Sequence, residues 1–251
     1  MQSPKSIFSA AFNVLLPNYC RICDLFLEDQ ELLCGECKSL VPRIKGKVCN
    51  HCGMPLSAKS KDQAVCQNCE KNIAALGSLR AFGIYEEALE KLTQQFKLHF
   101  DLSLTDFFAA KLSKLYTANF GKEKKHDCLV TVPHHRFTIV KRGFDHLYNL
   151  GSALSFRLQI PYRAEALFKT KWTRPQHKKS LLQRKTMSSK SFKVNGKENL
   201  DGMRILLVDD VVTTGTTLNA CAERLRASYR DIEIDGLAIA MTRRNDSAVS
   251  P

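Results

Sequence analysis

The amino-acid sequence predicts an α/β protein, in which a parallel β-sheet flanked by helices follows a small cysteine-rich module. Three observations predict this class. Eight of the ten cysteines stand before residue 70, strand and helix patterns alternate from about residue 73, and residues 205–208 form an unbroken apolar run typical of strands covered on both faces. The 251 residues have room for one medium-sized domain and one small module. We therefore expect an N-terminal module in residues 1–72 and an α/β domain in residues 73–251.

The segment before the first cysteine is predicted to be an amphipathic helix over residues 7–16 that packs onto the body of the protein and ends at Pro17. A short signal peptide is an alternative, but no small-residue cleavage site follows the apolar run. A membrane-surface helix is another, which the single preceding lysine disfavours. No apolar run reaches the roughly 20 residues that cross a bilayer, so we expect a cytoplasmic protein without a membrane span.

The eight N-terminal cysteines form four Cys-x-x-Cys pairs. These are Cys20 and Cys23, Cys34 and Cys37, Cys49 and Cys52, and Cys66 and Cys69. Two residues between thiolates let both bind one tetrahedral ion, so the four pairs predict two structural Zn²⁺ sites with four cysteine ligands each. Short gaps favour successive pairing, and an interleaved pairing stays open. Disulfides are the competing interpretation, which the lack of an export signal disfavours.

The rest of the chain alternates strand and helix patterns, which predicts a parallel sheet wrapped by helices. Besides the run at 205–208, strands are predicted at 79–85, 128–132 and 232–241. Helices are predicted at 86–96, 101–116 and 218–227, and a further helix is predicted to follow the segment 141–146 and to end at about residue 158. Cys128 and Cys221 fall within this pattern as small core residues. Because parallel strands place their carboxyl ends at one edge, ligand-binding loops are expected there.

The stretch 205–217 carries the chemistry expected at this edge. An apolar strand runs into Asp209 and Asp210, and then into a loop that opens a helix and consists of Thr213, Thr214, Gly215, Thr216 and Thr217. Backbone N–H groups at a helix start, unhindered at a glycine, can converge on a phosphate. Two carboxylates beside an anion need hydroxyl or cation partners, such as sugar hydroxyls or hydrated Mg²⁺. The stretch therefore predicts a site for a phosphorylated sugar; helix capping by the two acids is the plainer alternative.

A second phosphate-seeking segment follows the strand at 128–132. We expect Lys141, Arg142 and Gly143 to form a basic loop at the same edge of the sheet. Arg142 suits a pyrophosphate through its bidentate guanidinium group, and Gly143 permits close approach of the backbone. Lys141 as a solvated surface charge is the alternative, and His134 and His135 are expected on the loop surface rather than in catalysis.

These motifs resemble those of type I phosphoribosyltransferases, which bind phosphoribosyl pyrophosphate (PRPP). The resemblance implies that Asp209 and Asp210 contact the ribose hydroxyls and that the Thr213–Thr217 loop holds the 5′-phosphate, with Mg²⁺ accompanying PRPP. With the cysteine pairs, the Arg-Gly-Phe motif and the segment Thr173-Arg174-Pro175-Gln176, the chain resembles the competence protein F (ComF) family, which includes GntX-type proteins. That family commonly has Asn-Gln where this chain has Asp145 and His146, so contacts that depend on those amides are in question.

Residues 166–197 contain no acidic residue and are predicted to be a mobile basic loop, with room for a short helix around Leu181 and Leu182. The loop resembles the flexible lid of phosphoribosyltransferases, whose cationic side chains would close over pyrophosphate. The alternative is a nucleic-acid-binding arm with phosphate contacts and one stacking tryptophan. Its candidate residues are Lys171, Trp172, Arg174, Lys178, Lys179, Arg184 and Lys185. A solvated charged loop without a partner is the plainest interpretation.

The net charge of +13 indicates a polyanionic partner or substrate, and three functions compete. The resemblance favours a PRPP-binding protein that handles single-stranded DNA during natural transformation. The first alternative is an active phosphoribosyltransferase, with Asp209 and Asp210 at the catalytic centre and a nitrogen nucleophile that attacks the ribose. The second is a zinc-ribbon adaptor that docks a DNA helicase or a recombination mediator.

Overall fold

A computed structural model describes residues 18–29, 31–44, 46–56, 65, 66, 69, 73–121, 125–170 and 189–243. The predicted N-terminal helix, the candidate nucleic-acid-binding residues from Lys171 to Lys185 and the C-terminal tail lie outside the described residues. Within the described ranges, no helix is both long enough and apolar enough to cross a membrane.

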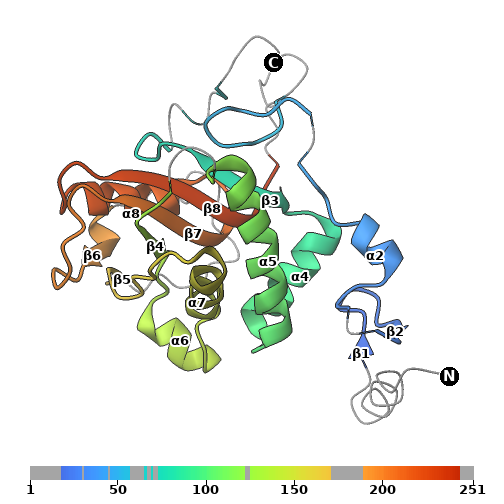
Figure 1. The fold of residues 1–251 in the computed structure, drawn as a ribbon. Coiled ribbons are helices and arrows are strands. Elements are labelled where there is room, and N and C mark those ends of the chain that lie inside the picture. The colour runs from blue at the N-terminus through green and yellow to red at the C-terminus, as the bar shows by residue number, and fades with distance from the viewer. Residues whose placement is uncertain are drawn as a thin grey trace, which may run out of the picture.

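The α/β domain is built on a four-stranded parallel sheet, as the sequence predicts (Figure 1). Its strands are β3 (Leu79–Ile84), β4 (Cys128–Thr131), β7 (Arg204–Val212) and β8 (Glu233–Met241). Their order across the sheet is β3-β8-β7-β4, and every neighbouring pair is parallel. The two central strands are therefore the last two in the chain. They are buried along most of their length, which explains their unbroken apolar sequences.

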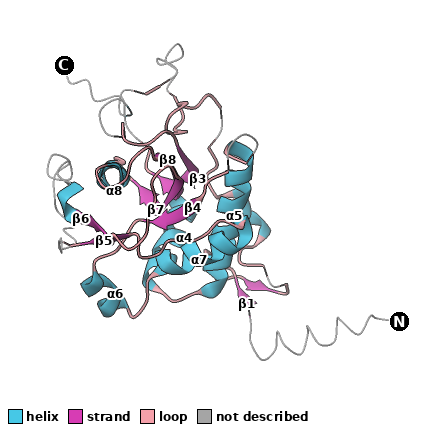
Figure 2. Cartoon of the chain, turned by 60° about the vertical axis from the view of Figure 1, so that its left-hand side comes forward, coloured by secondary structure: helices cyan, strands magenta, loops and turns pink. Residues whose placement is uncertain are grey.

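Helices cover both faces of the sheet, so the domain has three layers (Figure 2). The helices α4 (Glu87–Leu98), α5 (Leu102–Asn119) and α7 (His146–Leu158) lie on one face, and α8 (Thr216–Arg226) lies on the other. Asp101 and Asp145 begin α5 and α7, because their side chains accept hydrogen bonds from N–H groups of the first turn. Helix α5 packs against β3 and β8, α7 against β4 and β7, and α8 against β7.

The acid-free run 166–197 is partly regular, which corrects the prediction of one mobile loop. Its two ends pair as an antiparallel ribbon of β5 (Leu167–Lys169) and β6 (Phe192–Val194), and the 3-10 helix η3 (Ser189–Ser191) precedes β6. Leu167 and Phe192 are buried, and η3 and β6 pack against α8. Backbone pairing and apolar burial therefore hold both ends of the run against the body of the domain.

The N-terminal module lies along the outer edge of β3 (Figure 1). Its regular elements are the antiparallel strands β1 (Asn18–Tyr19) and β2 (Phe26–Leu27) and the short helix α2 (Gly35–Ser39). The N–H of Leu79 donates to the carbonyl of His51 at 2.7 Å, and the N–H of Ile84 donates to the carbonyl of Pro42 at 3.2 Å. The module thus covers an edge that would otherwise expose unpaired backbone groups.

Candidate zinc sites and phosphate site

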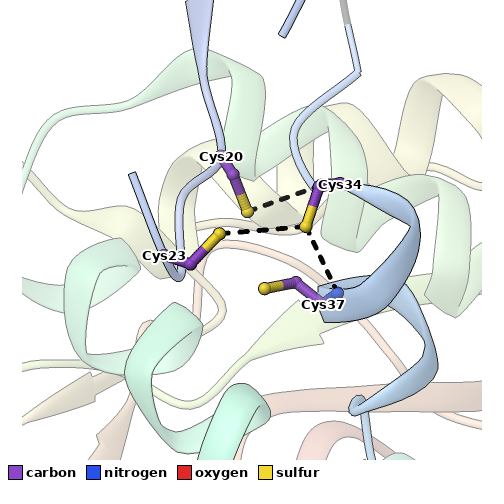
Figure 3. Close-up of side chains that lie close together, drawn as sticks. All are labelled: Cys20, Cys23, Cys34 and Cys37. Carbon is purple, nitrogen blue, oxygen red and sulfur yellow. Dashed lines mark hydrogen bonds between the residues drawn. The ribbon is translucent and has the colours of Figure 1, made fainter. Parts of the chain in front are cut away.

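The first four cysteines form one cluster (Figure 3). Cys20, Cys23, Cys34 and Cys37 come from the turn after β1 and from the start of α2, and their thiol groups gather at one point. The Sγ atoms of Cys23 and Cys34 are 3.8 Å apart, and the N–H groups of Cys34 and Cys37 donate to sulfur atoms at 3.4 Å. Thiolates bound to one tetrahedral Zn²⁺ lie about 3.8 Å apart, so this spacing fits a zinc ion.

The second cluster has the same design. The Sγ atoms of Cys49 and Cys69 are 3.6 Å apart, and those of Cys52 and Cys66 are 3.7 Å apart. The Cys49 sulfur accepts from the N–H groups of Cys52 and Cys66 at 3.5 and 3.3 Å. Gly53, which follows the second ligand, takes a left-handed conformation with φ 69° that closes the tight turn.

Both clusters join successive cysteine pairs, which confirms the favoured pairing and rules out the interleaved one. All ten cysteines are free thiols, so the disulfide interpretation is wrong. Cys128 and Cys221 are fully buried core residues, as predicted. Four thiolates fill a tetrahedral coordination sphere, so zinc in either cluster would have a structural role.

The predicted phosphate loop connects the carboxyl end of β7 to α8. Gly215 is the N-cap of α8 and has φ 82°, a left-handed conformation that favours glycine. A Cβ atom at this position would lie 2.3 Å from Cγ2 of Ile73, so close packing also requires glycine. The hydroxyl groups of Thr214 and Thr216 lie 2.6 Å apart on either side of it. The conformation and packing of Gly215 therefore fix the backbone of the loop at the carboxyl edge of the sheet.

Asp210 is buried on the face of the sheet that α4 and α7 cover. Its Oδ1 forms an ion pair with Nζ of Lys97 at 2.9 Å, and its Oδ2 accepts from Nε2 of His146 at 2.7 Å. The other ring nitrogen of His146, Nδ1, lies 3.4 Å from a terminal nitrogen of Arg142. Since an arginine can only donate and a carboxylate only accepts, His146 carries its proton on Nε2. One chain of contacts thus runs from Arg142 through His146 and Asp210 to Lys97.

Asp209 has different surroundings from its neighbour, because successive residues of a strand point to opposite faces. Its carboxyl group interacts electrostatically with Lys169 of β5 and Cys221 of α8. Its Oδ1 accepts from the N–H of Asp210 at 2.9 Å. Asp209 therefore faces α8 and the ribbon, whereas Asp210 faces α4 and α7.

The two acids differ in charge state. Burial raises the pKa of Asp209 to about 7, and the neighbouring Asp210 carboxylate adds to this effect. Burial acts on Asp210 in the same direction, but the hydrogen bond from His146 and the charge of Lys97 hold the pKa of Asp210 well below its usual range. Burial also lowers the pKa of His146, which leaves its ring neutral at pH 7. Asp210 is therefore ionised and balanced by Lys97, whereas Asp209 titrates near pH 7.

The segment that we predicted to be a basic loop is the end of a short helix, α6 (Arg136–Arg142). Gly143 ends this helix in a left-handed conformation, with φ 80°. Lys141 is exposed, whereas Arg142 is partly buried and reaches His146. A helix forms here because Arg136 to Arg142 contains no glycine or proline and has an N-cap. The structure thus brings Arg142 to His146, the partner of Asp210, from a helix terminus rather than from a loop.

The two histidines before α6 make structural contacts. His135 is the N-cap of α6, and its ring nitrogen accepts from the N–H of Phe137. Nδ1 of His134 lies 3.3 Å from Oδ1 of Asp145, the residue that begins α7. Both side chains are half-buried rather than on an exposed loop surface, because each contacts the start of a helix.

Asp209→Asn is expected to stabilise the fold, increasingly so as the pH rises. A raised pKa means that the folded protein holds the Asp209 proton more tightly than the unfolded chain does. The contribution of Asp209 to the free energy of unfolding of the wild type is therefore lost as the pH rises through about 7. Asparagine stays uncharged, so the variant does not lose stability in this way. We expect the gap in Tm between variant and wild type to be larger at pH 8 than at pH 6 in thermal unfolding. A gap in Tm that does not change with pH would contradict the charge state assigned to Asp209. The matched control is Asp210→Asn, which should lower Tm.

Sequence reasoning missed two residues of this site, Lys97 and His146. Lys97 lies on α4, far from Asp210 in the sequence, and no local pattern distinguishes it from a surface lysine. His146 did carry a signal, because it occupies a position where the chain departs from the family pattern. In the structure, the imidazole ring of His146 connects Arg142 to Asp210.

Comparison with known proteins defines the class of the protein. Residues 11–70 match the family model of a double zinc ribbon domain, and residues 139–244 match that of a phosphoribosyl transferase domain. The first match contains both cysteine clusters, and the second contains α7, β7 and the loop before α8. The chain is therefore a phosphoribosyltransferase-like protein with an N-terminal double zinc ribbon, the class that the sequence predicts.

The chain belongs to the competence protein F family. It is 30% identical to competence protein F of Haemophilus influenzae over 215 residues, which cover 83% of this chain and 90% of that protein. It is 26% identical to competence protein ComFC of Bacillus subtilis, with 79% of this chain and 80% of that protein covered. It is 27% identical to the DNA utilization protein YhgH of Escherichia coli K12, with 84% and 91% covered.

Proposed function

We propose that this protein binds PRPP at the carboxyl end of β7 and handles single-stranded DNA. The observation that carries the PRPP proposal is the buried acid pair that leads directly into the Gly215 loop and α8. A helix cap explains neither acid, since the N-cap of α8 is Gly215 and both acids lie within β7. This argues against the plainer alternative from the sequence.

The charge balance at this site explains how an anion could approach two aspartates. Lys97 balances Asp210, and the raised pKa of Asp209, about 7, leaves this acid partly protonated near neutral pH. A phosphate in the loop before α8 would therefore meet less repulsion than two ionised acids would produce. Arg142 would contact the pyrophosphate through its guanidinium group.

Magnesium would accompany PRPP, and Asp209 is the carboxylate suited to hold it. Oδ1 of Asp209 accepts one backbone hydrogen bond, whereas Asp210 already contacts Lys97, His146 and the N–H of Val211. Mg²⁺ prefers oxygen ligands and would supply positive charge to the pyrophosphate. Binding of the ion would favour the ionised form of Asp209, so PRPP and Mg²⁺ together should release a proton near pH 7.

The DNA part of the proposal draws on the relatives and on charge. Two relatives are named competence proteins and another is named a DNA utilization protein. The net charge of +13 suits a polyanion, and a double zinc ribbon supplies a rigid surface beside the α/β domain. Together these features favour DNA handling as the cellular role that the PRPP site serves.

Isothermal calorimetry with PRPP and Mg²⁺, repeated in the presence of a single-stranded oligonucleotide, tests this proposal. We expect micromolar PRPP binding by the zinc-loaded protein, with an observed binding enthalpy that changes with the ionisation heat of the buffer because a proton is released. A shift in PRPP affinity on adding DNA would support coupling of the two ligands. No heat with PRPP at millimolar concentration would refute the PRPP site and leave the zinc ribbons as the centre of function.

A further inference from the structure

A second cationic site lies where the N-terminal module meets the outer strand of the sheet. A groove of about 630 Å³ runs between residues 43–53, strand β3 and helix α5. None of its lining residues is acidic. Four of them are cationic, namely Arg43, Arg80, Lys111 and Lys114. Phe82 and Leu115 contribute apolar surface to the same groove.

One of the four cations is fixed in place. The guanidinium group of Arg80 donates to the carbonyl oxygens of Asn50 and His51 at 3.0 and 3.1 Å, and its Nε donates to Asn119 at 3.2 Å. These acceptors are uncharged, so they orient the arginine without neutralising it. Arg80 therefore joins the zinc module to the α/β domain and keeps its full positive charge in the groove.

The other three cations also lack neutralising partners. No ion pair in the described residues involves Arg43, Lys111 or Lys114. Lys111 and Lys114 are three residues apart on α5 and so lie on the same side of the helix. Burial lowers the pKa of Lys111, and the charges of Lys114 and Arg43 lower it further, against the opposing charge of Glu31. The three residues repel one another, and a bound anion would relieve that repulsion.

The groove is separate from the candidate PRPP site. Arg80 is the second residue of β3 and therefore lies near the amino end of the sheet, whereas the loop before α8 follows the carboxyl end of β7. A single phosphate would use only part of a groove that is lined by four cations and by apolar side chains. A polymer with regularly spaced phosphates and flat apolar bases matches both kinds of surface.

We propose that this groove between the second zinc ribbon, β3 and α5 binds the backbone of single-stranded DNA. The inference rests on the proposed function and locates its DNA contact in described residues, separate from the basic run 166–197. Arg43, Lys111 and Lys114 would contact phosphates, and Phe82 would pack against a base. The zinc ribbon would then be needed for DNA binding, because it supplies one wall of the groove.

Fluorescence anisotropy with a labelled oligothymidylate at several salt concentrations tests this inference. The double variant Lys111→Gln with Lys114→Gln is compared with wild type, after zinc content and Tm are checked. Loss of two phosphate contacts should lower the salt slope by about 1.4 and weaken binding roughly 20-fold at 0.1 M salt. The matched control, Lys91→Gln with Lys125→Gln, removes two exposed charges outside the groove and should change the slope little.

A third variant, in which Lys178, Lys179 and Lys185 are neutralised, separates the possible outcomes. If this variant lowers the slope and the groove variant does not, the groove inference is wrong but DNA handling stands. If wild type does not bind the oligonucleotide even at low salt, the DNA part of the proposed function itself fails. If polyglutamate displaces DNA from the groove at equal charge concentration, an acidic protein is the better partner and the inference is overturned.

Discussion

Asp209→Asn combined with Asp210→Asn is expected to abolish PRPP binding while leaving two zinc ions per chain. The double change removes both candidate contacts to the ribose and the carboxylate that forms an ion pair with Lys97. A ribose–carboxylate hydrogen bond contributes about 1.5 to 3 kcal/mol, so loss of two would weaken binding at least 100-fold. Calorimetry measures the loss, and metal analysis shows whether the distant zinc module is intact.

Asp235→Asn is the matched control for this variant. Asp235 also forms a carboxylate–histidine pair, with its Oδ2 3.2 Å from Nε2 of His126, and it also lies in a central strand. It stands near the amino end of β8, away from the candidate PRPP site. If Asp235→Asn weakens PRPP binding as much as the double variant does, the loss reflects general destabilisation rather than a ribose contact. Unaltered affinity in the double variant would refute the site itself.

Removal of zinc is expected to unfold the N-terminal module and to expose the edge of β3. Structural zinc sites supply about 10 kcal/mol or more of folding free energy in small ribbons. The module covers the N–H groups of Leu79 and Ile84, so these two amides should lose protection when a chelator removes the metal. Hydrogen exchange with and without chelator measures the effect, and metal analysis should give two zinc ions before treatment.

Cys128→Ala provides the control for the zinc experiment. Cys128 is buried in β4 and belongs to neither cluster, so the variant should retain both zinc ions. Cys37→Ser should lose one zinc ion, and Cys52→Ser should lose the other, because each cluster is self-contained. Full protection of Leu79 and Ile84 after metal removal would show that the module folds without zinc, against this expectation.

The elements of the α/β domain could be read from the sequence because their signals are local. The strand bounds of β3, β4 and β8 agree with the predicted ones to within one residue, and the two cysteine clusters use the predicted ligands. Periodic apolar residues and Cys-x-x-Cys spacing act over a few residues, so no knowledge of distant contacts was needed. The short helix α6 escaped prediction, because its seven residues are too few for a clear helical period.

The sequence alone was enough to predict the α/β fold class, the two groups of cysteine ligands and the location of the candidate site at the acid pair before the Thr-Gly loop. The tertiary structure decided how these parts meet. It placed the last two strands at the centre of the sheet, brought Lys97 and His146 to Asp210, and gathered Arg43, Lys111 and Lys114 in one groove. These contacts join residues far apart in the chain, and charge balance between such residues depends on distance and burial, which no local pattern records.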